Sequence, residues 1–133
     1  MRAQAPKLPK HVLDALDRVE IDRLEDAART ERDKVIVRLL ATSGIRAGEL
    51  LGLTPADLVE QGRDRFIRVH GKGARERLVP IQPQLYRRLQ RVARGRPADA
   101  RSDGLFVALR RSGSGCYMRC YKLWNVVQRR YTL

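Results

Sequence analysis

The sequence predicts an α+β domain that is mainly α-helical and contains a small antiparallel sheet, either a β-hairpin or three strands. Two observations lead to this fold class. Apolar residues recur at helical intervals in residues 13–28, 30–43 and 83–94. Between the last two segments, "RFIRVH" (65–70) and "RERLVPI" (75–81) are strand-like runs joined by a glycine-rich turn, which is typical of a hairpin. A chain of 133 residues has the length of one domain.

The first ten residues differ in composition from the rest of the chain. "MRAQAPKLPK" contains two prolines and three cations but little apolar surface to bury, so we expect a linker or an arm in residues 1–10. From His11 onward the domain begins. Apolar residues between Leu13 and Ala28 are spaced as in a helix and predict one helix or two short ones.

The next helices have recognisable ends. The Thr30 hydroxyl can accept a backbone N–H near Asp33, which predicts a helix start, and Gly44 predicts a left-handed cap at its end. A second, short helix is expected over residues 47–51. The sequence "TPAD" (54–57) combines a capping threonine, a proline at the first helical position and an acid, so it predicts one further helical turn.

Glycine and proline mark the limits of the predicted sheet. Gln61-Gly62 ends the helical pattern, and residues 71–74, "GKGA", supply a turn in which glycine can adopt a positive φ. Pro80 cannot donate a ladder hydrogen bond, which predicts an edge strand. Pro83 begins a helix with an arginine-rich outer side, and a loop comes next over residues 95–104.

The last segment is predicted to form a strand, a basic turn and a helix. "LFVAL" (105–109) is the strand, and "RRSGSG" (110–115) is the turn. Aromatic residues then recur at helical spacing, and they either pack on the core or stack on nucleic-acid bases. Cys116 and Cys120, four residues apart on this helix, are expected to be reduced and partly buried thiols without a metal. The aromatic residues are Tyr117, Tyr121, Trp124 and Tyr131.

The net charge of +13 is unevenly distributed. Residues 1–64 contain 11 Lys and Arg against 12 Asp and Glu, whereas residues 65–133 contain 17 against 3. Most of the cations are arginines, whose planar guanidinium matches phosphate oxygens. The second half therefore suits a polyanion, although a solvated basic face would have the same composition. The chain has no apolar run near 18 residues, so we expect a cytoplasmic protein that does not enter a membrane.

One charged pair lies at a predicted helix junction. In "ATSGIRAGELLGL" (41–53), Arg46 comes shortly after a capping glycine, and Glu49 comes three residues later. The carboxylate could hold the arginine from the next turn. By itself this spacing fits either a preorganised binding group or a structural ion pair.

Two stretches taken together resemble the catalytic domain of the tyrosine recombinases, the phage-integrase family of DNA strand-exchange enzymes. The first is "SGIRAGELLGL" (43–53), which fits the family pattern T-G-(L/I)-R-x-x-E-L-x-x-L with Ser43 in the place of threonine. The second is "HGKGARERLVP" (70–80), which fits the family's hairpin pattern. The resemblance extends from about Leu8 to the end of the chain. It implies that residues 11–133 are the N-terminal part of an integrase-type catalytic domain, truncated at its C-terminal end.

The resemblance implies functions for particular residues. Arg46 and Lys72 match the family's catalytic arginine and hairpin lysine, and Glu49 would support Arg46. A guanidinium can stabilise the charge that develops on phosphate oxygens, and an ammonium can protonate the leaving 5′-oxygen. The family needs no metal or nucleotide cofactor. Double-stranded DNA is the implied partner, which suggests association with the nucleoid, and the expected contacts are Lys72, Arg75, Arg77, Arg119 and Lys122.

The family's remaining catalytic residues have no match. Neither His11 nor His70 begins an H-x-x-R motif, and Tyr131 precedes the place of the nucleophilic tyrosine. We therefore expect this chain to bind DNA but to be inactive alone, with self-association or a further C-terminal segment covering the aromatic residues. The alternative is a noncatalytic DNA-binding or regulatory protein derived from an integrase. An unrelated RNA-binding module would explain only the charge.

Overall fold

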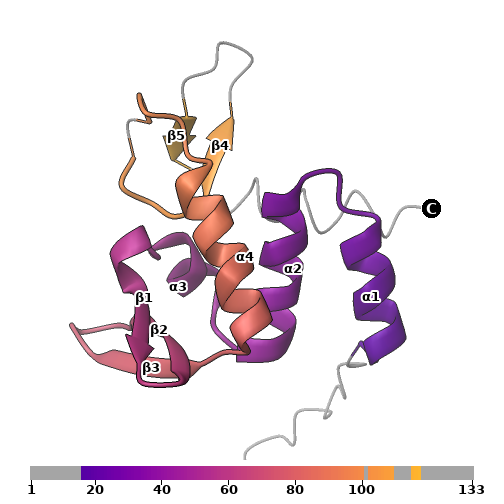
Figure 1. Ribbon diagram of the computed structural model, residues 1–133, viewed down its shortest axis with the longest axis horizontal. Helices are drawn as coiled ribbons and strands as arrows, with labels where there is room; N and C mark the ends of the chain where they lie inside the picture. The colour runs from indigo at the N-terminus through magenta and orange to yellow at the C-terminus, as the bar shows by residue number, and fades with distance from the viewer. Residues whose placement is uncertain (1–15, 101, 110–114, 118–133) are drawn as a thin grey trace, which may run out of the picture.

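The computed structural model of the chain describes residues 16–100, 102–109 and 115–117 (Figure 1). Its elements are, in chain order, α1 (Arg18–Asp26), α2 (Glu31–Ser43), α3 (Ala47–Leu51), the 3₁₀ turn η1 (Pro55–Asp57), β1 (Leu58–Gln61), β2 (Asp64–His70), β3 (Glu76–Pro80), α4 (Pro83–Arg94), β4 (Val107–Leu109) and β5 (Gly115–Tyr117). The predicted arm in residues 1–10 lies outside the described residues. So do Arg119, Lys122, Tyr121, Trp124 and Tyr131.

Side-chain caps fix where the first two helices begin. α1 starts at a capping box, in which Asp17 accepts the Glu20 N–H at 2.8 Å and the Glu20 carboxylate accepts the Asp17 N–H at 2.9 Å. Thr30 accepts the N–H of Asp33 at 3.1 Å, as predicted for the start of α2. Gly44 ends α2 with a φ of 65°, so the predicted left-handed cap is confirmed.

The sheet has three antiparallel strands in the order β1-β2-β3. β2 and β3 form the predicted hairpin, with Val69 opposite Arg77 and His70 opposite Glu76. Pro80 lies on β3, an edge strand, as its missing N–H requires. The sequence did not assign residues to β1, because its four residues, "LVEQ", are too few to show an alternation.

The core lies where α2, α3, α4 and the sheet meet. In Figure 1, α2 and α4 run side by side, and the sheet lies toward one end of the pair. The loop after α4 also contributes, because the Leu105 N–H donates to the Leu53 carbonyl at 2.6 Å and both side chains are buried. This packing buries about a dozen apolar side chains, among them Val35, Ile36, Leu39, Leu50, Leu53, Ile67, Val69, Leu85, Leu89 and Leu105.

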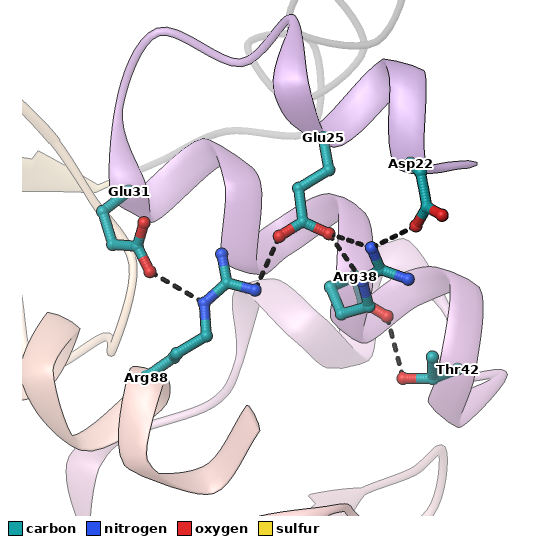
Figure 2. A network of polar contacts seen from close by, with 6 residues as sticks. All are labelled: Asp22, Glu25, Glu31, Arg38, Thr42 and Arg88. Atoms are coloured by element: carbon teal, nitrogen blue, oxygen red, sulfur yellow. Dashed lines mark hydrogen bonds and ion pairs between the residues drawn. The ribbon is translucent and has the colours of Figure 1, made fainter. Parts of the chain in front are cut away.

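A network of charged side chains joins α1 to this core (Figure 2). Glu25, which is 9% exposed, accepts from Arg38 of α2 at 2.5 Å and from Arg88 of α4 at 2.6 Å. Asp22 and Glu31 complete the pairing of these two guanidinium groups. A buried carboxylate is costly unless its oxygens are paired, so the network constrains how α1 lies on α2 and α4.

The end of the described chain differs from the prediction. The strand predicted at 105–109 is present as β4 but begins only at Val107, and Cys116 and Tyr117 lie in β5, paired with Ala108 and Val107, and not in a helix. Pairing with β4 satisfies backbone groups that a helix would have satisfied within itself. Cys116 is therefore in a strand, and Cys120 lies outside the described residues. None of the helices in the described part of the chain is long and apolar enough to span a membrane.

The left-handed cap at Gly44 can be tested with a matched glycine. Gly44→Ala should lower the free energy of unfolding by about 1 kcal/mol, because a Cβ is unfavourable at positive φ. Gly48→Ala, within α3 and with open space around it, should raise the free energy of unfolding by about 0.5–1 kcal/mol. Urea unfolding measures both values. Equal effects at the two positions would contradict the role of the cap.

Candidate functional site

Arg46 lies in the bend between α2 and α3. Gly44 reverses the chain, Ile45 is anchored in the core at 5% exposure, and Arg46 is the N-cap residue of α3 with extended backbone angles. The Arg46 side chain is exposed. Within the described residues its guanidinium forms no ion pair with a carboxylate, so it remains available to an external anion.

Lys72 lies on a tight turn between β2 and β3, here called the lysine turn (residues 71–75). The Gly71 N–H donates to the Arg75 carbonyl at 2.7 Å, which closes the turn. Gly73 and Ala74 both have positive φ, at 76° and 59°. A Cβ at Gly71 would lie 3.2 Å from the Arg75 oxygen, so the close approach favours glycine. Lys72 and Arg75 are exposed, and neither forms an ion pair with a carboxylate of the described residues.

Glu49 connects the two motifs. Its carboxylate receives both terminal nitrogens of Arg77, with Nη1–Oε1 at 2.8 Å and Nη2–Oε2 at 2.9 Å, and Oε2 also accepts the Arg46 N–H at 2.8 Å. The Glu49 side chain is 10% exposed and that of Arg77 is 48% exposed. The Arg77 hydrogen bonds, with that from the Arg46 backbone, lower the pKa of Glu49 to about 2.

This geometry differs in detail from what the sequence predicts. Glu49 does contact Arg46, but through the main-chain N–H, and its guanidinium partner is Arg77. Arg77 was predicted to contact DNA, but both terminal nitrogens of its guanidinium donate to Glu49 within the protein. The spacing of Arg46 and Glu49 could not reveal this pair, because Arg77 comes 28 residues after Glu49.

His70 forms a second connection at the base of the lysine turn, which sequence reasoning missed. Its Nε2 lies 2.8 Å from Oδ1 of Asp57, and its Nδ1 lies 3.1 Å from Oε1 of Glu76. The other Asp57 oxygen accepts the N–H of Thr54 at 2.8 Å, and Asp57 is 4% exposed. The hydrogen bond to Asp57 raises the pKa of His70 above 6.5; Glu76 adds to the shift and Arg68 opposes it.

The structure thus brings together the predicted residues of the two motifs at the start of α3 and the end of the hairpin: Arg46, Glu49, Lys72, Arg75 and Arg77. The predicted DNA contacts Arg119 and Lys122 lie outside the described residues. In residues 16–100, 102–109 and 115–117, no three His, Cys, Asp or Glu side chains gather as a metal site would need.

Comparisons with known proteins identify the family of the chain. Residues 14–125 match the Phage integrase family. Tyrosine recombinase XerD of Shewanella oneidensis is 38% identical over 84 residues, which are 59% of this chain and 27% of XerD. Tyrosine recombinase XerA of Saccharolobus solfataricus is 31% identical over 119 residues, covering 85% of this chain and 40% of that protein.

The fold also matches a solved structure. The crystal structure of XerA recombinase aligns with a TM-score of 0.68 and 26% sequence identity, over 86% of this chain and 40% of that one. The predicted fold class, α+β with the architecture of a tyrosine-recombinase catalytic domain, is therefore confirmed. The chain spans less than half the length of each of these relatives.

The interaction between His70 and Asp57 predicts a pH effect with a defined sign. Because the folded-state pKa of His70 is raised, its contribution to stability is complete below the ordinary value of 6.5 and is lost as the pH rises through the folded-state pKa. An NMR titration of the imidazole should give a pKa above 6.5. Asp57→Asn should lower this pKa markedly, and Glu76→Gln should lower it less. An unchanged His70 titration in Asp57→Asn would contradict this assignment.

Proposed function

Because this chain belongs to the phage integrase family, with residues 14–125 matched, we propose that it acts in site-specific recombination of double-stranded DNA. The proposal is supported by two exposed cations, Arg46 and Lys72. They lie on elements that the contacts of Glu49 with Arg77 and with the Arg46 backbone join. Neither cation is neutralised by a carboxylate of the described residues. Both are therefore free to bind phosphate oxygens.

The proposed chemistry is determined by the charge changes at phosphorus. A tyrosine hydroxyl loses its proton to water and its oxygen attacks the phosphorus, so that a 3′-phosphotyrosyl bond forms as the bond to the 5′-oxygen breaks. Arg46 donates two charge-assisted hydrogen bonds to the nonbridging oxygens, where negative charge develops. Lys72 gives a proton to the leaving 5′-oxygen, a step that general-acid catalysis accelerates about 10²–10⁴-fold. A second hydroxyl attack reverses the steps and rejoins the strands.

The 133 residues supply only part of this chemistry. They contain no H-x-x-R motif, and Tyr131 does not match the position of the family's nucleophile. For these residues by themselves we propose duplex binding without strand cleavage. Lys72 and Arg75 of the lysine turn and Arg46 would contact phosphates, and Arg119 and Lys122 remain proposed contacts from the sequence.

A second candidate is a noncatalytic regulatory protein that occupies DNA sites. Occupancy of DNA would need only exposed cations such as Arg46, Lys72 and Arg75, which the described residues contain. The two functions differ in one observable respect. If the chain is part of a recombinase, a separately produced segment that contains the missing arginine and tyrosine should restore cleavage, and Lys72→Ala should abolish it. A regulatory protein would give no cleavage in this mixture.

Duplex binding should depend strongly on salt. If about six phosphates are contacted, log K against log[salt] should have a slope near −5. Lys72→Ala and Arg75→Ala should each make this slope less steep by about 0.9, since each removes one phosphate contact. Fluorescence anisotropy with a labelled duplex measures the slope.

Arg29→Ala is a matched control for these variants. Arg29 is exposed in the loop between α1 and α2, at the opposite end of α2 from the sheet (Figure 1). Its removal should leave the slope unchanged. A flat salt response of the unmodified chain, or equal slopes for Lys72→Ala and the unmodified chain, would contradict the proposed binding surface.

Strand cleavage by the chain alone can be tested with nicked duplex DNA, which traps covalent intermediates. We expect salt-sensitive binding but no protein–DNA adduct that survives denaturation, because such an adduct requires a tyrosine nucleophile in an activating environment. Denaturing gel electrophoresis separates the two species. A stable adduct would show that a nucleophile lies within these 133 residues, and Tyr131→Phe would then test which tyrosine it is.

A further inference from the structure

We propose that Arg77 is a positioning residue, which acts through Glu49 to hold the lysine turn against the start of α3 and does not contact DNA itself. The inference rests on the proposed function, because it concerns how Arg46 and Lys72 come to face the same phosphate. From the sequence we expected both hairpin arginines, Arg75 and Arg77, to bind DNA, and the inference differs from that expectation.

The position of Arg77 on the hairpin is the first argument. It lies on β3, two residues after the lysine turn, and its partner across the ladder is Val69. Paired residues of an antiparallel sheet share a face, and Val69 is fully buried. The Arg77 side chain therefore starts from the core side of the sheet, at its rim, and reaches toward α3.

The arrangement of hydrogen bonds at Glu49 is the second argument. Both terminal nitrogens of Arg77 donate to this carboxylate, and the Arg46 N–H donates to Oε2. A two-point contact fixes the relative orientation of the two groups as well as their separation. One carboxylate therefore holds both the backbone of Arg46 and the strand that leads out of the lysine turn.

Gly71 lies directly over this ion pair. A Cβ built at Gly71 would be 3.9 Å from Nη1 of Arg77 and 3.9 Å from Oε1 of Glu49. A side chain at the first residue of the lysine turn would thus be in van der Waals contact with the pair, and Lys72 is the next residue. A displacement of the Glu49–Arg77 pair would be transmitted from Gly71 to Lys72 through the single peptide unit that joins these two residues.

Arg75 provides the contrast. It is exposed, and among the described residues it forms no ion pair, so its guanidinium is available to a phosphate. Arg77 would have to give up two charge-assisted hydrogen bonds to make the same contact. Because the pKa of Glu49 is about 2, the carboxylate stays ionised and the pair persists throughout the neutral pH range.

A double-mutant cycle on duplex binding separates positioning from direct contact. The variants are Arg77→Ala, Glu49→Gln and the double variant, with Arg75→Ala in both Glu49 backgrounds as the matched control. If Arg77 acts through Glu49, Arg77→Ala weakens binding about tenfold alone and has little further effect after Glu49→Gln. Arg75→Ala weakens binding equally in both backgrounds.

The sign of the Glu49→Gln effect is a second readout. Simple electrostatics predicts tighter DNA binding when a negative charge is removed. Positioning predicts weaker binding, because the fixed orientation of Arg77 is lost. Tighter binding by Glu49→Gln, or an equal loss from Arg77→Ala in both backgrounds, would overturn the proposal and make Arg77 a direct DNA contact.

Hydrogen exchange in the free protein tests the positioning without DNA. The Gly71 N–H is protected by its bond to the Arg75 carbonyl, and it should exchange roughly tenfold faster in Arg77→Ala but not in Arg75→Ala. Arg77→Lys, which keeps the charge but cannot form the two-point contact, should give an intermediate rate. Equal Gly71 exchange in Arg77→Ala and the unmodified chain would overturn the inference.

These two measurements also separate failure of the inference from failure of the proposed function. If the unmodified chain does not bind duplex DNA, the proposed function is wrong, while Gly71 exchange still decides whether Arg77 holds the turn. A cooperative unfolding transition in each variant, monitored by circular dichroism, confirms that the variants are folded. Arg77→Lys supplies the comparison if Arg77→Ala does not fold.

Discussion

The geometry of the candidate site depends on the hydrogen bonds that the Glu49 carboxylate accepts. It is the point where the bend after α2 and the hairpin, which are separated in sequence, are joined by hydrogen bonds. The sheet ladder sets where Arg77 starts, and the N-cap position sets where the Arg46 N–H points. Without an acceptor between them, the core would still place α3 near β2, but the relative orientation of Arg46 and the lysine turn would be free to vary.

The uneven charge of the sequence appears at the protein surface because ion pairs within the protein occupy some charged groups and leave others exposed. Carboxylates from the first half accept cations from the second: Glu25 accepts from Arg88, Glu49 from Arg77 and Asp57 from His70. These acids are therefore occupied, and Arg46, Lys72 and Arg75 are left without acidic partners among the described residues. Selective pairing, more than total charge, leaves exposed cations where a phosphate can reach them, namely Arg46, Lys72 and Arg75.

Features set by neighbouring residues were predictable from the sequence. The Thr30 cap and the hairpin each depend on residues a few positions apart, and both are confirmed. Arg46 and Lys72 could be named as candidates for the same reason, since each lies in a short motif. Features that depend on distant contacts were not predictable. β1 is a strand because β2 pairs with it, and only the fold selects Arg77, among the many arginines of the basic half, as the partner of Glu49.

Ala74 indicates how the lysine turn is kept in one conformation. A residue with a Cβ at a φ of 59° carries a cost of about 1 kcal/mol, so the turn is not the conformation that its own sequence prefers at this position. Such strain persists only where surrounding contacts over-determine the backbone. Here those contacts are the Gly71–Arg75 hydrogen bond within the turn, the ladder below it and the Arg77 ion pair beneath Gly71. Since an exposed ion pair adds little stability by itself, the value of Arg77 lies in selecting this conformation of the turn that carries Lys72.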